Sequence, residues 1–316
     1  MSFNDREMKI FSGSSNVGLA KKISENLGVP LGNCQFSTFS DGEINIKINE
    51  TVRGRHVFIM QSTCNPVNDN LMELFIAVDA FKRASAKSIN AIIPYYGYAR
   101  QDRKARGRDP ITAKLVANLL TEAGLSRVLT TDLHSEQIQG FFDIPLDNLY
   151  SFPVFSDYIL NSFVCTENCV VVSPDIGGVK RANKFATKLG VPLAILDKRR
   201  PKDNFVEIVN VIGDLRKVKT AIFFDDIIDT GRSLVEGAGI IKKKGIEKIY
   251  CCATHGVLSG KAKELIQNSV IDGVFITDTI PHAELPDKFY VVSLAELLSE
   301  AISRVYNNES ISIMFE

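Results

Sequence analysis

Short apolar runs alternate with segments of helical periodicity along almost the whole chain, and this alternation limits the folds that it can adopt. In the first half, the runs IFSG, VFIMQS and INAIIPYY precede helical segments that begin near Asn16, Pro66 and Thr112. In the second half, the runs are CVVVSPD, LAILDK, TAIFFDD, KIYCCATH, VFITD and FYVVS, with helices predicted from about Gly178 and Arg232. Alternating strands and helices are typical of a mainly parallel sheet covered by helices, so the sequence predicts an α/β fold.

The length of the chain and the recurrence of this order indicate two domains. The chain has 316 residues, of which 45% are hydrophobic, which is more than one average domain needs to form a packed core. The same strand and helix order occurs in both halves. We therefore predict two similar domains, residues 1–148 and 149–316, each a mainly parallel sheet flanked by helices.

Charge and cysteine content narrow the class of protein. The 37 basic and 37 acidic residues cancel, which argues against long-range attraction to nucleic acid or to an anionic membrane. No run approaches the roughly 20 apolar residues that span a bilayer, and no signal-like stretch opens the sequence. The six cysteines lie outside zinc-binding spacing, and Cys251 and Cys252 fall inside an expected buried strand. A soluble cytoplasmic protein with reduced cysteines is expected.

The segment FFDDIIDTGRS, residues 223–233, is the most informative turn. Its buried strand ends in the carboxylates of Asp225 and Asp226. The chain then turns into a helix through Asp229, Thr230, Gly231, Arg232 and Ser233. Backbone N–H groups and the helix dipole favour an anion at such an edge, and the two carboxylates suit ribose hydroxyls. An ordinary helix N-cap is the simpler alternative, but adjacent carboxylates that end an apolar strand argue against it.

Four further segments follow expected strands. In YYGYARQDRKAR, cations beside tyrosines suit a polyphosphate and a base, whereas RNA binding and a solvated loop are alternatives. In TTDLHSEQ, Asp132 and His134 favour Mg²⁺ or phosphate and a structural role about equally. In VVSPDIGG, Asp175 precedes glycines that allow close approach to phosphate, or simply make a turn. In LAILDKRRPKDN, the cations are either surface charges or a mobile cationic lid.

FFDDIIDTGRS resembles the phosphoribosyl-binding motif of the phosphoribosyltransferase superfamily. FSDGEI, YYGYARQDRKAR, DLHSEQIQGFFDIP, SPDIGG and DKRRP resemble, in order and spacing, the class I ribose-phosphate diphosphokinases of the bacterial type over nearly the entire chain. The resemblance implies two phosphoribosyltransferase-like domains. It also implies transfer of the β,γ-diphosphate of ATP to the 1-hydroxyl of ribose 5-phosphate, giving 5-phosphoribosyl 1-diphosphate and AMP for nucleotide biosynthesis.

The same resemblance implies a role for particular residues. Those expected to bind ATP are Phe39, Asp41, Glu43, Arg100 and Gln101, with the first three reaching a neighbouring subunit's site. His134 and Asp175 are expected to engage the Mg²⁺ cofactor, and Lys198 and Arg200 to be the catalytic cations. The residues expected to bind ribose 5-phosphate are Asp225, Asp226, Asp229, Thr230, Gly231, Arg232 and Ser233. The resemblance further implies a homo-oligomer, a hexamer by analogy, and an effector site for phosphate or ADP.

Arg232 departs from the family pattern, which has a small residue at this position of the loop. A phosphoribosyltransferase that consumes the activated sugar would share FFDDIIDTGRS, but it would not need FSDGEI, DLHSEQIQGFF or DKRRP. A non-catalytic regulatory subunit would keep the fold, yet the expected metal-binding residues and lid cations are all present. The synthetase hypothesis is therefore preferred over both.

Overall fold

The computed structural model describes residues 7–162, 164, 166–202 and 205–315 of the chain. These residues form two compact units. The first extends to Tyr150 and includes Thr279–Pro281 and Ser293–Glu316, and the second comprises Ser151–Asp278 and His282–Val292. The predicted division at residues 148 and 149 placed the C-terminal helix in the second domain, whereas its contacts lie in the first unit.

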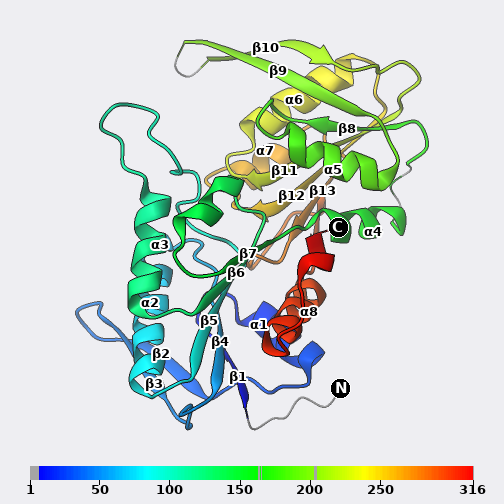
Figure 1. Cartoon of the computed structure of the whole chain (residues 1–316). Helices are drawn as coiled ribbons and strands as arrows, with labels where there is room; N and C mark the ends of the chain where they lie inside the picture. The colour runs from blue at the N-terminus through cyan, green and yellow to red at the C-terminus, as the bar shows by residue number, and fades with distance from the viewer. Residues whose placement is uncertain (1–6, 163, 165, 203–204, 316) are drawn as a thin grey trace. The chain divides into compact units, whose positions relative to one another are not determined.

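A parallel sheet forms the centre of the first unit (Figure 1). Its strands, in spatial order, are β1 (Met8–Ser12), β4 (His56–Met60), β5 (Ser88–Ile93), β6 (Arg127–Thr131) and β7 (Leu146–Leu149). Every neighbouring pair in this order is parallel. Because parallel strands begin at one edge and end at the other, the turns that follow β4, β5 and β6 all leave the same edge of the sheet.

Helices cover both faces of this sheet. They are α1 (Val17–Leu27), α2 (Val67–Arg83), α3 (Thr112–Ala123), the short 3₁₀ helix η1 (Glu136–Phe141) and the C-terminal α8 (Ala295–Tyr306). Val57 and Ile59 of β4 face the core that α2 and α3 share, and the intervening Phe58 is buried outside that cluster. This alternation is expected of a strand whose two faces are both covered. Helix α8 contacts α1, which explains why the C-terminal segment belongs to the first unit.

An antiparallel hairpin is the exception to the parallel pattern of the first unit. It consists of β2 (Cys34–Thr38) and β3 (Ile44–Ile48), and β3 contacts helix α2. At its tip, the N–H of Phe39 donates to the carbonyl of Glu43 at 2.8 Å, and Gly42 adopts φ +97°. A residue with a Cβ would be strained there, so the glycine of FSDGEI is explained by the turn itself.

A larger sheet forms the centre of the second unit. Its strands, in spatial order, are β10 (Phe205–Ile212), β9 (Leu193–Lys202), β8 (Cys169–Ser173), β11 (Thr220–Ile228), β12 (Lys248–Gly256), β13 (Gly273–Thr277) and β14 (Phe289–Val292). All neighbours are parallel except β9 and β10, which are antiparallel. The central strand β11 lies between β8 and β12, so the turn that follows it leaves the middle of the sheet.

Helices pack on both faces of the second sheet as well. They are α4 (Phe152–Leu160), α5 (Val179–Leu189), α6 (Arg232–Lys243) and α7 (Ala262–Gln267). Phe223 of β11 faces the core shared with α6 and α7, whereas Phe224 stacks on Phe185 of α5 with ring centroids 4.3 Å apart. The predicted mainly parallel sheet flanked by helices is thus confirmed in both units. The helices whose starts were predicted, α1, α2, α3, α5 and α6, begin within one residue of those starts.

Among the described cysteines, Cys64, Cys169, Cys251 and Cys252 are buried, and Cys34 is partly buried. Burial raises the pKa of the Cys64 thiol to about 11, as expected of an unreactive core thiol. Cys165 lies outside the described residues. Within the described part of the chain, no helix has the length and apolar character needed to cross a membrane.

Candidate functional site

The loop that follows β11 links the centre of the second sheet to helix α6. Gly231 precedes the first residue of α6 and adopts φ +73°, and its carbonyl accepts the N–H of Val235 at 3.0 Å. Thr230 is exposed and Ser233 is partly buried. The first N–H groups of a helix have no partner within the helix, so this loop presents backbone donors and two hydroxyls at the carboxyl edge of the sheet. That combination suits a phosphate group.

Close packing between α6 and the sheet fixes the position of this loop. A Cβ added to Gly237 of α6 would lie 2.7 Å from Leu196 Cδ1 and 3.4 Å from Phe223 Cε1. Only glycine therefore lets the helix backbone approach β9 and β11 so closely. The buried apolar residues that end in Phe224 anchor the strand, and the polar residues that follow emerge where a ligand can reach them.

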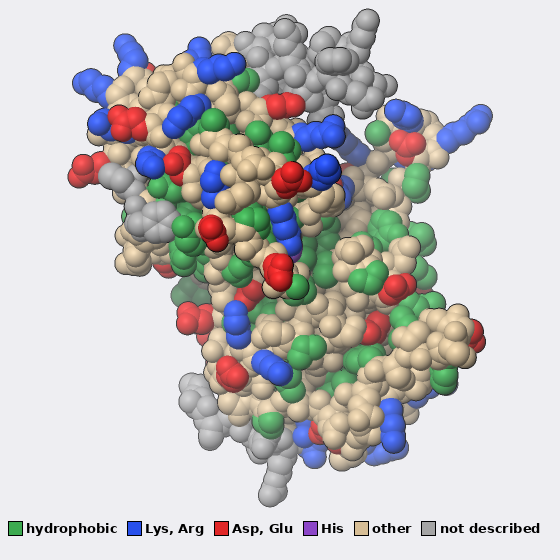
Figure 2. All heavy atoms as spheres, turned by 180° about the vertical axis from the view of Figure 1, so that it is seen from behind, with side chains coloured by type: hydrophobic (Ala, Val, Ile, Leu, Met, Phe, Trp, Pro, Cys, Tyr) green, Lys and Arg blue, Asp and Glu red, His purple; other side chains and the backbone are tan. Residues whose placement is uncertain are grey.

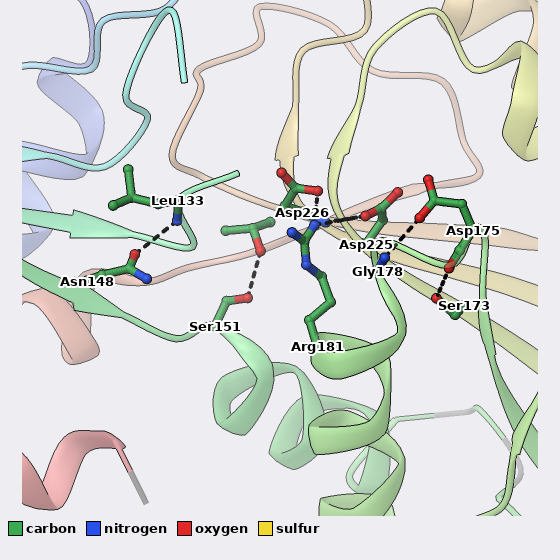
Figure 3. A network of polar contacts seen from close by, with 10 residues as sticks. Leu133, Asn148, Ser151, Ser173, Asp175, Gly178, Arg181, Asp225 and Asp226 are labelled. Carbon is green, nitrogen blue, oxygen red and sulfur yellow. Dashed lines mark hydrogen bonds and ion pairs between the residues drawn. The ribbon is translucent and has the colours of Figure 1, made fainter. Parts of the chain in front are cut away.

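Two adjacent carboxylates end the apolar part of β11 and meet one guanidinium (Figure 3). Arg181 Nη1 donates to Asp225 Oδ1 at 2.9 Å and also contacts Asp226 Oδ1. The side chain of Asp226 is only 4% exposed, whereas that of Asp225 is 28% exposed. A nearly buried carboxylate needs a compensating charge or several donors. The cation from α5 supplies this compensation.

The turn after β8 brings a third carboxylate to the same edge. The N–H of Gly178 donates to Asp175 Oδ1 at 2.8 Å, and Ser173 Oγ donates to the Asp175 carbonyl at 2.7 Å. A Cβ added to Gly178 would lie 3.6 Å from Asp175 Oδ1 and 3.7 Å from Asp225 Oδ1. Asp175 and Asp225 thus converge around one glycine, as Figure 3 shows, and Asp175 is exposed.

In the first unit, the turn after β6 carries the predicted histidine. Asp132 adopts φ +42°, and the N–H of Leu133 donates to the buried Asn148 Oδ1 at 2.9 Å (Figure 3). A left-handed aspartate is uncommon, and the side chain of Asn148 on β7 holds the turn in this form. His134, which follows, is exposed. Asn148 was not identified from the sequence, because the role of an asparagine on a strand can be recognised only from its contact.

Asp132 also contributes to the electrostatics of this turn. Burial, together with the negative charges of Glu136 and Asp132, raises the pKa of Tyr150 to about 12. Tyr150 Oη donates to Glu136 Oε1 at 3.1 Å. The turn therefore keeps a neutral phenol beside two acidic groups.

The residues expected to bind the nucleotide all lie in the first unit and are exposed. Phe39, Asp41 and Glu43 form the tip of the β2–β3 hairpin, where Phe39 is 56% exposed. Arg100 and Gln101 follow β5, whose carboxyl end lies beside that of β6. An exposed phenylalanine followed by two acids offers a stacking face and hydrogen-bond acceptors, which suit an amino-substituted aromatic base.

The basic loop after Tyr98 is ordered by contacts near both of its ends. The N–H of Gln101 donates to the Tyr98 carbonyl at 2.9 Å, and Thr112 Oγ1 donates to Gln101 Oε1 at 2.5 Å. The N–H of Arg106 donates to Asp109 Oδ2 at 2.7 Å. Arg103, Lys104 and Arg108 are exposed between these contacts, so the loop offers cations around a fixed framework.

The two residues predicted to supply catalytic cations belong to strand β9, which extends to Lys202. The side chains of Lys198 and Arg200 lie outside the described residues. Strand β9 pairs with the antiparallel β10, with register shifts along the pair. The charged residues that follow Asp197 therefore continue strand β9 as far as Lys202. The sequence did not predict this extension, because the strand was recognised from its apolar residues and these residues are polar.

The sequence reasoning did not identify Arg181. It occupies the third position of α5, in the helix's first turn, where the positive end of the helix dipole disfavours a cation. An arginine in the first turn of a helix indicates that it pairs with an acid elsewhere. That indication was present in the sequence and could have been used. Its partners are 44 and 45 residues away in the sequence, so the contact itself requires the fold.

Side chains at the turns after β6 and after β8 are of types that can bind a metal ion already associated with a phosphate group. Within the described part of the chain, no three His, Cys, Asp or Glu side chains gather closely enough to hold an ion. Mg²⁺ is commonly bound by one or two carboxylates together with substrate phosphates and water. The exposed carboxylate of Asp175 fits that mode of binding. The exposed imidazole of His134 can bind a metal ion directly or through a water molecule bound to the ion.

Positive and negative side chains are interspersed over the face of the molecule seen in Figure 2. This mixture agrees with the balanced composition of 37 basic and 37 acidic residues. Among the described residues on this face, Lys and Arg side chains are therefore mixed with acids and form no broad basic surface.

Comparison with known proteins gives the family. Residues 8–124 match the N-terminal domain of ribose phosphate pyrophosphokinase, and residues 197–316 match the phosphoribosyl synthetase-associated domain. A ribose-phosphate pyrophosphokinase from Thermosipho africanus is 63% identical over 315 residues, covering 100% of this chain and 99% of that protein. Another from Thermotoga maritima is 59% identical over 316 residues, with 100% of both proteins covered.

A solved structure agrees with these relatives. The crystal structure of phosphoribosylpyrophosphate synthetase from Mycobacterium smegmatis matches with a TM-score of 0.88 at 40% identity, covering 96% of this chain and 99% of that one. The match confirms the fold class predicted from the sequence. By the identity and coverage of these relatives, the chain belongs to the ribose-phosphate pyrophosphokinase family of enzymes.

Proposed function

We propose that this enzyme transfers the β,γ-diphosphate of ATP to the 1-hydroxyl of ribose 5-phosphate. The products are 5-phosphoribosyl 1-diphosphate, a precursor of nucleotides, and AMP. The observation that carries the proposal is the pairing of a phosphate-binding loop, Asp229–Ser233, with the adjacent carboxylates Asp225 and Asp226 at one sheet edge. Membership of the pyrophosphokinase family supports diphosphate transfer.

The second unit binds the sugar in this proposal. The backbone N–H groups and hydroxyls of the loop hold the 5-phosphate, and the helix α6 dipole favours its charge. Asp225 and Asp226 accept hydrogen bonds from ribose hydroxyls, because ionised carboxylates are acceptors only. The sugar is thereby held at both ends with its 1-hydroxyl free to react.

The nucleotide is assigned to Phe39, Asp41 and Glu43 for adenine and to Arg100 and Gln101 for the rest of ATP. Oxygen O1 of the sugar attacks the β-phosphorus and its hydroxyl proton is released to water. The bond from that phosphorus to the α-phosphate bridging oxygen breaks, and AMP leaves. Lys198 and Arg200 are assigned to stabilise the charge that builds on these oxygens. His134 and Asp175 are assigned to Mg²⁺, which supplies charge neutralisation on the phosphates when bound.

The remaining parts of the proposal concern assembly, control and location. Adenine-binding residues at a hairpin tip that serve a neighbouring chain require a homo-oligomer, and we propose a hexamer. An effector site for phosphate or ADP belongs to the same proposal. The cytoplasm is the proposed location, because ATP and sugar phosphates are available there.

One assay tests the reaction. The protein is mixed with ATP, Mg²⁺ and ribose 5-phosphate, and nucleotide products are separated by chromatography. AMP should form in step with a phosphorylated sugar that carries a diphosphate. ADP as the product would mean transfer of a single phosphoryl group and would refute diphosphate transfer. No product would instead favour a non-catalytic subunit.

A further inference from the structure

Arg181 is placed where a cation needs a compensating partner. It lies in the first turn of α5, where the helix dipole disfavours positive charge, and its side chain is 25% exposed. The guanidinium extends from this turn to β11 and contacts Asp225 and Asp226 through one nitrogen, Nη1 (Figure 3). The two carboxylates therefore supply the compensating charge that its own helix does not.

The two carboxylates, in turn, require a nearby positive charge. Asp226 is nearly buried and is adjacent in sequence to another acid, so desolvation and like-charge repulsion both disfavour the ionised pair. Asp225 Oδ1 also accepts the Asp226 N–H at 2.9 Å, which fixes its rotamer beside the guanidinium. The guanidinium thus offsets the negative charge of both carboxylates and helps to orient them.

We propose that Arg181 is a positioning residue for the sugar. It holds Asp225 and Asp226 as a pair of acceptors matched to the vicinal 2- and 3-hydroxyls of ribose 5-phosphate. This inference rests on the proposed function, which assigns the two aspartates to the ribose, and it adds what makes them selective. The site then prefers sugar phosphates with both hydroxyls over those that lack one.

The preference follows from hydrogen-bond accounting at a partly buried site. When a sugar lacks the 2-hydroxyl, a carboxylate oxygen that has lost water on binding is left without a donor. A site built to hydrogen-bond a hydroxyl discriminates strongly against an analogue without it. We expect the enzyme to bind ribose 5-phosphate at least about tenfold more tightly than 2-deoxyribose 5-phosphate.

The test compares both sugar phosphates in Arg181→Gln, Arg181→Lys and Lys188→Gln. Lys188 is an exposed cation in the last turn of the same helix and serves as the matched control. Dissociation constants are measured by calorimetry, and KM and kcat by AMP formation. Circular dichroism and thermal unfolding report whether each variant is folded.

In Arg181→Gln, the affinity for ribose 5-phosphate should fall by about 10- to 100-fold, and the deoxy sugar should lose much less. The ratio of the two dissociation constants should then approach one. Arg181→Lys keeps the charge on a shorter side chain, so its ratio should lie between those of wild type and Arg181→Gln. Lys188→Gln should keep the wild-type ratio.

Equal weakening of both sugars in Arg181→Gln would show a merely structural role and would overturn the proposal. If Arg181→Gln does not fold, the folded Arg181→Lys protein decides, and a wild-type ratio there would also overturn it. Failure of the proposed function gives a different result. The wild-type protein would then form no AMP, while calorimetry still reports whether sugar selectivity depends on Arg181.

Discussion

The exposed guanidinium of Arg232 begins helix α6 directly after the loop assigned to the 5-phosphate. A cation at the first position of a helix is disfavoured by the dipole unless an anion binds there. A bound sugar phosphate would supply that anion. The backbone N–H groups of the loop remain available whatever side chain stands at this position, so Arg232 should strengthen phosphate binding without being essential to it.

Arg232→Ala is therefore expected to raise KM for ribose 5-phosphate by about three- to tenfold and to leave kcat unchanged. Steady-state AMP formation measures both constants. The effect should shrink at high ionic strength, because salt screens an exposed charge pair. Lys243→Ala, at the other end of α6, is the control and should behave as wild type. An unchanged KM in Arg232→Ala would mean that the backbone alone holds the phosphate.

At the scale of elements, the junction between β11 and α6 depends on Gly231. Its φ of +73° strains any residue with a Cβ, and an added Cβ would lie 3.1 Å from Ile266 Cδ1 of α7. Gly231→Ala should lower the stability of the second unit by about 1–2 kcal/mol, or several degrees in the thermal unfolding midpoint. It should also weaken ribose 5-phosphate binding, because the loop must shift.

Gly239, within the same helix, is the matched control. A Cβ there meets nothing within 4 Å and its φ is not positive. Gly239→Ala should raise the unfolding midpoint slightly, because alanine is favoured over glycine in a helix by roughly 0.5–1 kcal/mol. Differential scanning calorimetry compares the two variants. Equal midpoints would contradict the assigned conformation of Gly231.

The elements themselves were largely predictable from the sequence, because strand and helix periodicities alternate cleanly and helix starts carry turn residues. Contacts between distant residues were not. Arg181 pairs with acids 44 and 45 positions away, and Asn148 clamps Leu133 from the next strand. In neither case can the partner be identified without the fold. The sequence also did not predict that β9 continues beyond Asp197. This part of the strand is polar, and it is defined by its pairing with β10 and not by apolar periodicity.

At the scale of the whole molecule, the first and second units carry different halves of the proposed chemistry. The hairpin tip and the β5 turn of the first unit are assigned to ATP, and the β11 turn of the second unit is assigned to the sugar. The β6 turn of the first unit and the β8 turn of the second are assigned to Mg²⁺. The C-terminal helix α8 packs on α1 in the first unit. The sequence did not show which unit contains α8, because a terminal amphipathic helix can cover either sheet.

The proposed sharing of an active site between chains predicts complementation. Phe39→Ala damages the adenine position and Asp226→Asn damages the sugar position, so each variant alone should have low activity. If Phe39 serves a neighbouring chain, a co-expressed mixture contains sites in which both positions are intact. Random assembly in equal amounts should restore roughly a quarter of wild-type AMP formation.

Sharing and non-sharing give opposite results in this mixture. If both positions of a site belong to one chain, every chain carries one defect, every site is damaged, and mixing restores no activity. Light scattering on the same samples gives the molar mass and shows whether chains associate at all. Association without recovered activity would therefore reject the shared site while leaving the oligomer intact. Recovered activity would place Phe39 and Asp226 of each working site on different chains.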